Sequence, residues 1–118
     1  MRNLSKVKKN RYNRRGLKTG LWCRYFIDGS ICSSGSYKNG VAEGIWEGYH
    51  SNGQLEAKGS YINGSLEGYW EYYYETGELR SKGNFINGGR DGIWEYYYKN
   101  GKLDYRKLYQ CGEYVEIL

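Results

Sequence analysis

The chain of 118 residues contains no proline, a single histidine and three cysteines. Without proline, nothing interrupts the hydrogen-bonded ladder of a β-sheet. No apolar run approaches the length of a membrane span or of the hydrophobic segment of a signal peptide. An odd number of cysteines is more typical of a reducing compartment than of a disulfide framework. These absences argue against a membrane partner and predict a cytoplasmic protein.

Aliphatic residues are also scarce. Leu, Ile, Val and Phe make up 21 of the 118 residues, a share that together with high net charge is typical of disordered chains. Trp, Tyr and Phe, however, make up 18% of the chain, and each such ring buries roughly 150–250 Å². Aromatic rings therefore supply the missing apolar surface, and the length predicts one folded domain.

Positive charge is concentrated at the start of the chain. Residues 1–15 hold seven basic side chains and no acid, so the remainder, with 11 basic and 13 acidic residues, is slightly acidic. This basic N-terminal arm, or degenerate edge strand, has two interpretations: a solubility tail, or a contact for phosphates or an acidic protein surface. The residues assigned to electrostatic contact are Lys6, Lys8, Lys9, Arg11, Arg14 and Arg15.

A 24-residue pattern recurs four times without insertion. Its landmarks are a glycine, a tryptophan two residues later and a tyrosine three residues beyond that, as in Gly44, Trp46 and Tyr49. Such a period predicts a modular array whose units bury their apolar faces against their neighbours, and arrays of this kind usually act as binding surfaces. The predicted domain, 16–118, comprises repeats 16–40, 41–64, 65–88 and 89–112 and a C-terminal cap, 113–118.

Asn-Gly pairs predict the strands of each repeat. Asn52-Gly53 and Asn63-Gly64 are typical of two-residue type I′ turns, which need positive φ at both residues. Each repeat is therefore predicted to form two antiparallel strands. The fold class is all-β, an antiparallel meander of about eight strands built from four β-hairpin repeats.

A two-residue turn at 52–53 also predicts the register. Trp46 lies opposite Gly59, and Tyr61 lies opposite Gly44, so that rings cover bare glycine backbone; Gly35 and Gly83 are expected to lie under Trp22 and Trp70 in the same way. The same register places acids opposite bases, which supports the pairing. The predicted ion pairs are Glu47–Lys58, Glu71–Lys82 and Glu95–Arg106.

Alternation along the strands sorts the side chains between two faces. One face is predicted to carry the four tryptophans, the row Ile31/Leu55/Leu79/Leu103 and the row Phe26/His50/Tyr74/Tyr98. The other face is predicted to carry the ion pairs and the row Tyr25/Tyr49/Tyr73/Tyr97.

The unit that runs from Gly44 through Trp46 and Tyr49 to Leu55 resembles the MORN repeat, in the shorter bacterial variant of the YwqK-type antitoxin family. The resemblance covers residues 16–112. It implies an elongated, curled antiparallel sheet without a catalytic centre. It further implies a binding partner, which is a toxin for the antitoxin-named members and membrane lipid for others.

No catalytic, cofactor or metal site is predicted. His50 stands where other repeats have an aromatic ring, and no second base recurs near it. Cys23 and Cys32 are diagonal on one hairpin, which disfavours a disulfide or a two-cysteine metal site. The glycines belong to turns and ring-covered positions, and none forms a phosphate-binding loop before a helix. The chain is therefore predicted not to be an enzyme.

Tyrosine is more abundant than one packed face requires. A strip of tyrosines is typical of protein-recognition surfaces, although tyrosine also simply suits a half-exposed sheet. The candidate partner-binding residues are Tyr25, Tyr49, Tyr73 and Tyr97, with Tyr72 and Tyr96.

Two functions follow as hypotheses. The first is a non-catalytic scaffold that binds and restrains a protein such as a toxin or nuclease-like effector, as an antitoxin-like neutraliser does. The alternative is a phage-type inhibitor of a nucleic-acid-handling enzyme, anti-CRISPR-like, or a nucleic-acid or ribonucleoprotein binder acting through the basic arm. Self-association through open sheet ends is a further expectation.

Overall fold

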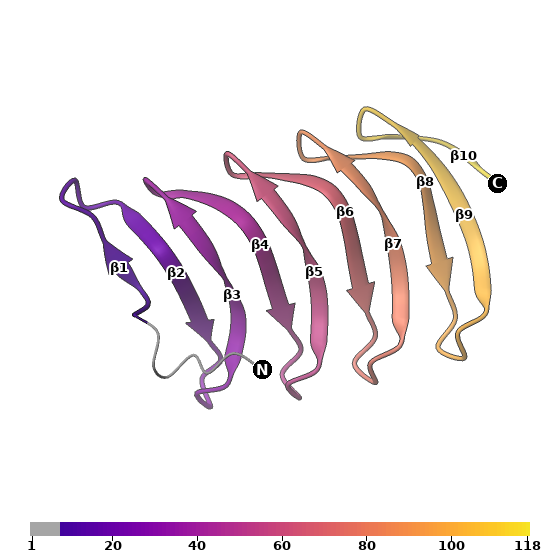
Figure 1. Cartoon of the computed structure of the whole chain (residues 1–118). Helices are drawn as coiled ribbons and strands as arrows, with labels where there is room; N and C mark the ends of the chain where they lie inside the picture. Colours follow the sequence, from indigo (N-terminus) through magenta and orange to yellow (C-terminus); the bar gives the residue numbers. More distant parts are fainter. Residues whose placement is uncertain (1–7) are drawn as a thin grey trace.

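The computed structural model describes residues 8–118, which form a single antiparallel sheet (Figure 1). Its ten strands lie side by side in chain order, so every connection is a hairpin. The strands are β1 (Arg11–Tyr12), β2 (Lys18–Tyr25), β3 (Ile31–Lys38), β4 (Val41–Tyr49), β5 (Leu55–Ile62), β6 (Ser65–Tyr73), β7 (Leu79–Ile86), β8 (Gly89–Tyr97), β9 (Leu103–Gln110) and β10 (Glu113–Ile117).

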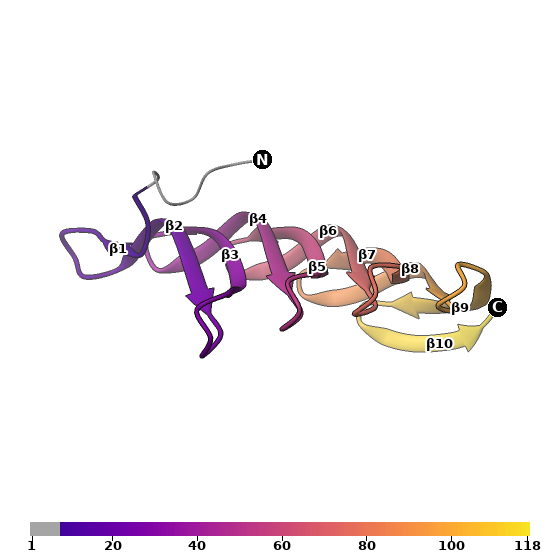
Figure 2. The same cartoon turned by 90° about the horizontal axis from the view of Figure 1, so that it is seen from below.

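The predicted all-β meander is confirmed. It has ten strands in place of about eight, because Arg11–Tyr12 and Glu113–Ile117 pair with the outer strands of the repeats. The molecule measures 49 × 30 × 23 Å, and its radius of gyration of 16.1 Å exceeds the roughly 13–14 Å expected for a compact chain of this length. The side view shows one elongated, curled layer (Figure 2).

Two kinds of turn alternate along the sheet. Asn63 and Gly64 have φ of 50° and 82°, and they join β5 to β6 as the predicted type I′ turn. The prediction for Asn52-Gly53 is wrong, because only Gly53 has positive φ there. The Gly53 N–H donates to His50 O and the His50 N–H donates to Gln54 O, which makes a three-residue loop with a glycine bulge. A register shift beside Tyr49 restores the predicted pairing farther along the strands.

The predicted register is confirmed, yet the ring that covers each glycine comes from another strand pair. Trp46 pairs with Gly59, but it is Trp70, from the following hairpin, that lies over Gly59. Trp46 and Trp94 lie over Gly35 and Gly83 in the same way, so the predicted covers Trp22 and Trp70 are wrong for these two glycines. The register shift opposite each of these glycines turns the following tryptophan back over it.

Each of these indoles also makes a hydrogen bond to the strand that it covers. The ring nitrogens Nε1 of Trp46, Trp70 and Trp94 donate to the carbonyl oxygens of Ser36, Ser60 and Asn84, at 3.2, 3.1 and 3.0 Å. The tryptophan therefore joins one hairpin to the previous one, through apolar contact and a hydrogen bond together.

Gly44 has a different role from the one predicted. It does pair with Tyr61, but a side chain at this position would meet no atom within 4 Å, so no ring requires the space. Its φ of 82° lies in the left-handed region that favours glycine. Gly44 thus allows the backbone bulge that precedes the tryptophan.

An edge-to-face chain of rings runs along the tryptophan face. From Tyr12 to Trp94 consecutive rings lie 5.0–6.1 Å apart with steep interplanar angles, in the order Tyr12, Trp22, Tyr37, Trp46, Tyr61, Trp70, Phe85, Trp94. Such contacts stabilise a fold by about 0.5–1.5 kcal/mol each beyond their buried area. The described core is accordingly aromatic and centres on Trp70, Phe85, Trp94 and Tyr109.

Only one of the three predicted ion pairs forms. Arg106 Nε lies 2.9 Å from Glu95 Oε2, and Glu95 also approaches Lys82 of the neighbouring hairpin at 3.9 Å. Glu47–Lys58 and Glu71–Lys82 are paired in register but do not make salt bridges. These carboxylates face tyrosine hydroxyls on their own strands, and Tyr49 donates to Glu47 at 3.1 Å.

We expect alanine to destabilise the protein at Gly59 and to stabilise it at Gly48. A Cβ on Gly59 would overlap the indole of Trp70, whereas one on Gly48 would meet nothing within 4 Å. Displacing a packed ring costs about 1–3 kcal/mol, and replacing an unstrained glycine stabilises by about 0.4–1 kcal/mol. Urea unfolding of Gly59→Ala and Gly48→Ala measures both effects. Equal midpoints for the two variants would contradict the proposed role of the glycine.

Candidate functional site

The tyrosine row of the polar face lies where strands β2, β4, β6 and β8 end. Tyr25 is 43% exposed, and Tyr49, Tyr73 and Tyr97 are half-buried. Burial raises the pKa of the Tyr49 and Tyr73 hydroxyls, and the neighbouring carboxylates Glu47 and Glu71 raise it further. The hydroxyls therefore stay neutral and can donate hydrogen bonds.

A row of exposed apolar side chains accompanies the tyrosines and was missed from the sequence. Ile45, Tyr69 and Ile93 are 63%, 50% and 52% exposed. Each directly precedes a tryptophan, so alternation places it on the polar face. A shallow hollow lined by Ile45, Tyr69 and Glu71 lies there. The sequence signal is the apolar residue between the repeat glycine and its tryptophan.

Tyr72 and Tyr96 lie on the opposite face and belong to the packed layer. Tyr72 stacks on Trp70 with ring centroids 6.1 Å apart, and the Tyr96 hydroxyl lies 3.1 Å from that of Tyr109. Burial, followed by this hydroxyl contact, raises the pKa of Tyr96 well above its ordinary range. These two candidates therefore do not join the tyrosine row.

The basic residues of the arm do not form one patch. The Lys9 ammonium lies over the ring of Tyr25, 5.2 Å from its centroid, and a hydrogen bond with Tyr25 raises the pKa of Lys9. Arg14 and Arg15 lie in the loop between β1 and β2, at the other end of the strands from Tyr25. Arg11 lies in the edge strand β1 and Lys8 is exposed. Lys6 lies outside the described residues.

A second lysine–tyrosine contact lies on the same face, between the third and fourth repeats. The Lys82 ammonium lies 5.8 Å from the ring centroid of Tyr97. A hydrogen bond with Tyr97 is the main cause of the raised pKa of Lys82. The tyrosine row thus has a cation beside it near each end.

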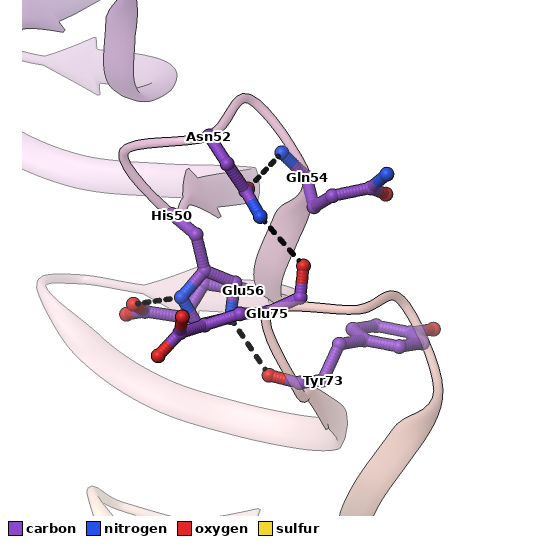
Figure 3. Close-up of polar contacts among 6 residues, drawn as sticks. All are labelled: His50, Asn52, Gln54, Glu56, Tyr73 and Glu75. Atoms are coloured by element: carbon purple, nitrogen blue, oxygen red, sulfur yellow. Dashed lines mark hydrogen bonds and ion pairs between the residues drawn. The ribbon is translucent and has the colours of Figure 1, made fainter. Parts of the chain in front are cut away.

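His50 connects the second hairpin to the third (Figure 3). Its Nε2 lies 2.9 Å from the carbonyl oxygen of Tyr73, and its Nδ1 lies 3.2 Å from Glu56. Asn52 of the same turn donates to Glu75 O at 2.7 Å. In the next repeat, Tyr74 takes the place of His50 and donates to Tyr97 O at 2.6 Å. The histidine therefore links neighbouring repeats, as its aromatic equivalent does.

Three further features bear on function in residues 8–118: cysteine pairs, metal sites and membrane-spanning helices. Cys23, Cys32 and Cys111 are free thiols. Within the described part of the chain, no three His, Cys, Asp or Glu side chains converge as a metal site would require. The same residues include no helix with the length and apolar character needed to cross a membrane.

Comparison with protein families decides the classification. The MORN repeat variant model matches residues 42–63, 66–87 and 90–110, which is more than half of the chain. The chain belongs to the MORN repeat variant family. Each matched segment starts in the first strand of a MORN hairpin and ends in its second strand or the turn that follows it. No curated protein matches the MORN chain.

We expect Tyr74→Phe to weaken the contact between MORN hairpins. The change removes only the hydroxyl that donates to Tyr97 O, and the loss of such a hydrogen bond costs about 0.5–1.5 kcal/mol. Tyr98→Phe is the matched control, because Tyr98 occupies the same position in the last repeat, is 51% exposed, and bonds to Asp104 of its own hairpin. Urea unfolding should show the larger loss for Tyr74→Phe. Equal losses would show that the bond between hairpins contributes no more than an exposed bond within one hairpin.

Proposed function

We propose that this MORN protein is a non-catalytic scaffold that binds a protein partner on its polar face and restrains it. The proposed partner is a toxin or nuclease-like effector, which makes the protein an antitoxin-like neutraliser. The observation that carries the proposal is the pair of parallel rows on that face, the apolar row Ile45, Tyr69 and Ile93 beside the tyrosine row.

The composition of these rows suits recognition. Tyrosine offers rigid contact area with a polar tip, and it is enriched among the residues that dominate binding energy. Exposed apolar side chains gathered on one face are typical of interaction sites. Because each hairpin adds two strands, successive members of a row lie roughly 10 Å apart. A partner can thus contact several repeats at once.

The absence of catalysis is part of the proposal. Its support is that the chemically versatile groups already have structural partners. His50 bonds to Tyr73 O and Glu56, Glu95 pairs with Arg106, and Glu47 accepts a hydrogen bond from Tyr49. The three free thiols support a reducing compartment, and we place the protein in the cytoplasm on this ground.

Replacing both Tyr73 and Tyr97 with alanine should weaken partner capture. Truncation of two central interface tyrosines is expected to lower affinity by about tenfold or more. The full chain and the double variant would be used for affinity capture from the native host, with Tyr98→Ala as an exposed tyrosine outside the row. Circular dichroism would verify that each variant is folded. Equal recovery of the partner by the double variant and the full chain would exclude this face.

One observation favours the alternative of nucleic-acid binding. Lys9 lies on Tyr25, which brings a phosphate-binding cation and a stacking ring together, as single-stranded nucleic-acid sites do. Such a contact would suit an anti-CRISPR-like inhibitor or a ribonucleoprotein binder.

For this alternative, titration with single-stranded RNA and DNA at 50 and 200 mM salt is the test. Binding through the arm should weaken steeply with salt and should be reduced by Lys8→Gln with Lys9→Gln. The same double change should reduce capture of a protein partner less than Tyr73→Ala with Tyr97→Ala does, because Lys9 contacts Tyr25 at one end of the tyrosine row. A signal that does not depend on salt, or on these two lysines, would remove the nucleic-acid alternative.

A further inference from the structure

A second hollow lies over strands β6 to β9 on the tryptophan face, and Tyr97, the last member of the tyrosine row, is also among its lining residues. It has a volume of about 340 Å³. Its floor is Ser81, which is 6% exposed and pairs with Tyr72 on one side and with Tyr96 on the other. The hollow exists because a small residue lies between two large rings.

Two arginines line this hollow, and neither forms a salt bridge within residues 8–118. Arg90 lies over the rings of Trp94 and Tyr109, 5.1 and 5.6 Å from their centroids. Arg80 is exposed on the bulge of β7. Burial raises the pKa of Tyr72, and the charges of Arg90 and Arg80 oppose this rise. Tyr72, Arg80 and Arg90 all line the same hollow.

One more cation lies over two of the tyrosines that line the hollow, and one acidic side chain is part of the lining. Lys107 lies 5.5 Å from the ring centroids of both Tyr96 and Tyr105. Asp104, the one carboxylate of the lining, accepts a hydrogen bond from Tyr98. The hollow thus has an excess of positive charge, although residues 16–118 are slightly acidic as a whole.

The MORN repeat itself does not require these charges. Arg80 has Cys32, Glu56 and Asp104 as its equivalents, and Lys107 has Gly35, Gly59 and Gly83. The same hairpin therefore forms with neutral or acidic residues at these positions. The gathering of Arg80, Arg90 and Lys107 around one hollow is a property of the third and fourth repeats alone.

The chemistry of the hollow selects carboxylates. Guanidinium groups bind planar oxyanions with two parallel hydrogen bonds, and the Tyr72 hydroxyl adds a donor beside them. A nucleobase would need an open aromatic slot, but Tyr96 and Tyr105 are stacked on each other, 4.7 Å apart at 14°, with Lys107 over both. The tyrosine walls instead suit the apolar stems of glutamate side chains.

We propose that this hollow binds an acidic peptide segment of a protein partner, with a glutamate or aspartate carboxylate placed between Arg80 and Arg90. Tyr97 is the one member of the tyrosine row that lines this hollow, and binding between Arg80 and Arg90 does not depend on the function proposed for the other face. The two faces together would allow one partner to wrap around the edge of the sheet, or two partners to bind at once.

The test is a titration of the full chain with N-acetylated hexaglutamate, followed by amide chemical shifts, with hexaglutamine as the uncharged control. Hexaglutamate should shift the signals of Ser81 and its neighbours, and hexaglutamine should not. Arg80→Gln should weaken binding by about tenfold, the loss expected for a charged hydrogen bond. Arg80→Glu should abolish binding, and because Glu56 is its natural equivalent in the second repeat, the fold should tolerate it.

Arg15→Gln is the matched control, since it removes one positive charge in the distant loop between β1 and β2. It should leave hexaglutamate binding unchanged. Equal losses with Arg15→Gln and Arg80→Gln would show attraction by net charge only and would overturn the proposal, as would the absence of any shift. Inorganic phosphate that binds in place of hexaglutamate, with the same dependence on Arg80, would overturn the assignment to an acidic peptide.

Discussion

The packing of three tryptophans on bare glycine backbone of the preceding hairpin holds the MORN sheet together. A single layer of hairpins has no second layer to bury its apolar side chains, so cohesion must come from contacts along the layer itself. Trp46, Trp70 and Trp94 supply it by lying over Gly35, Gly59 and Gly83 and donating to the same strands. Because each indole crosses from one repeat to the next, stability depends on neighbouring repeats and not on any one hairpin.

This use of one face for cohesion leaves the other face available for a partner. On the polar face Ile45, Tyr69 and Ile93 are exposed. Their side chains are therefore free to contact a partner. The tryptophan face is not uniform either. Trp70 and Trp94 are buried because Tyr72 lies against both, whereas Arg24 and Gly48 stand at its position in the first two repeats. The charged hollow lies in the third and fourth repeats, where this additional layer of rings forms its walls.

Much of the fold could be predicted because the repeat is regular. A period of 24 residues, Asn-Gly turns and alternation predicted the strands, the opposed pairs such as Trp46–Gly59, and the face of the tryptophans. The row Ile31/Leu55/Leu79/Leu103 was wrongly predicted on the tryptophan face. It pairs with the tyrosine row, because a bulge shifts the register just before each of these pairs. The loop at Asn52-Gly53 was not predicted, because Asn-Gly is compatible both with a type I′ turn and with a three-residue loop that needs only Gly53 at positive φ. The strand β10 was predicted only as a C-terminal cap, and an edge strand in residues 1–15 only as an alternative to an arm, because these residues break the repeat pattern.

The sequence by itself determined that this protein is an array of antiparallel hairpins with the tryptophans on one face, since spacing along a strand decides which side chains share a face. Only the tertiary structure decided which ring covers which glycine, because a bulge shifts the register between hairpins and turns each indole toward the preceding strand. It likewise decided that Lys9 meets Tyr25 while Arg14 and Arg15 lie elsewhere, and that Arg80 and Arg90 share one hollow. These residues are distant or unpatterned in the chain, and only folding brings them together.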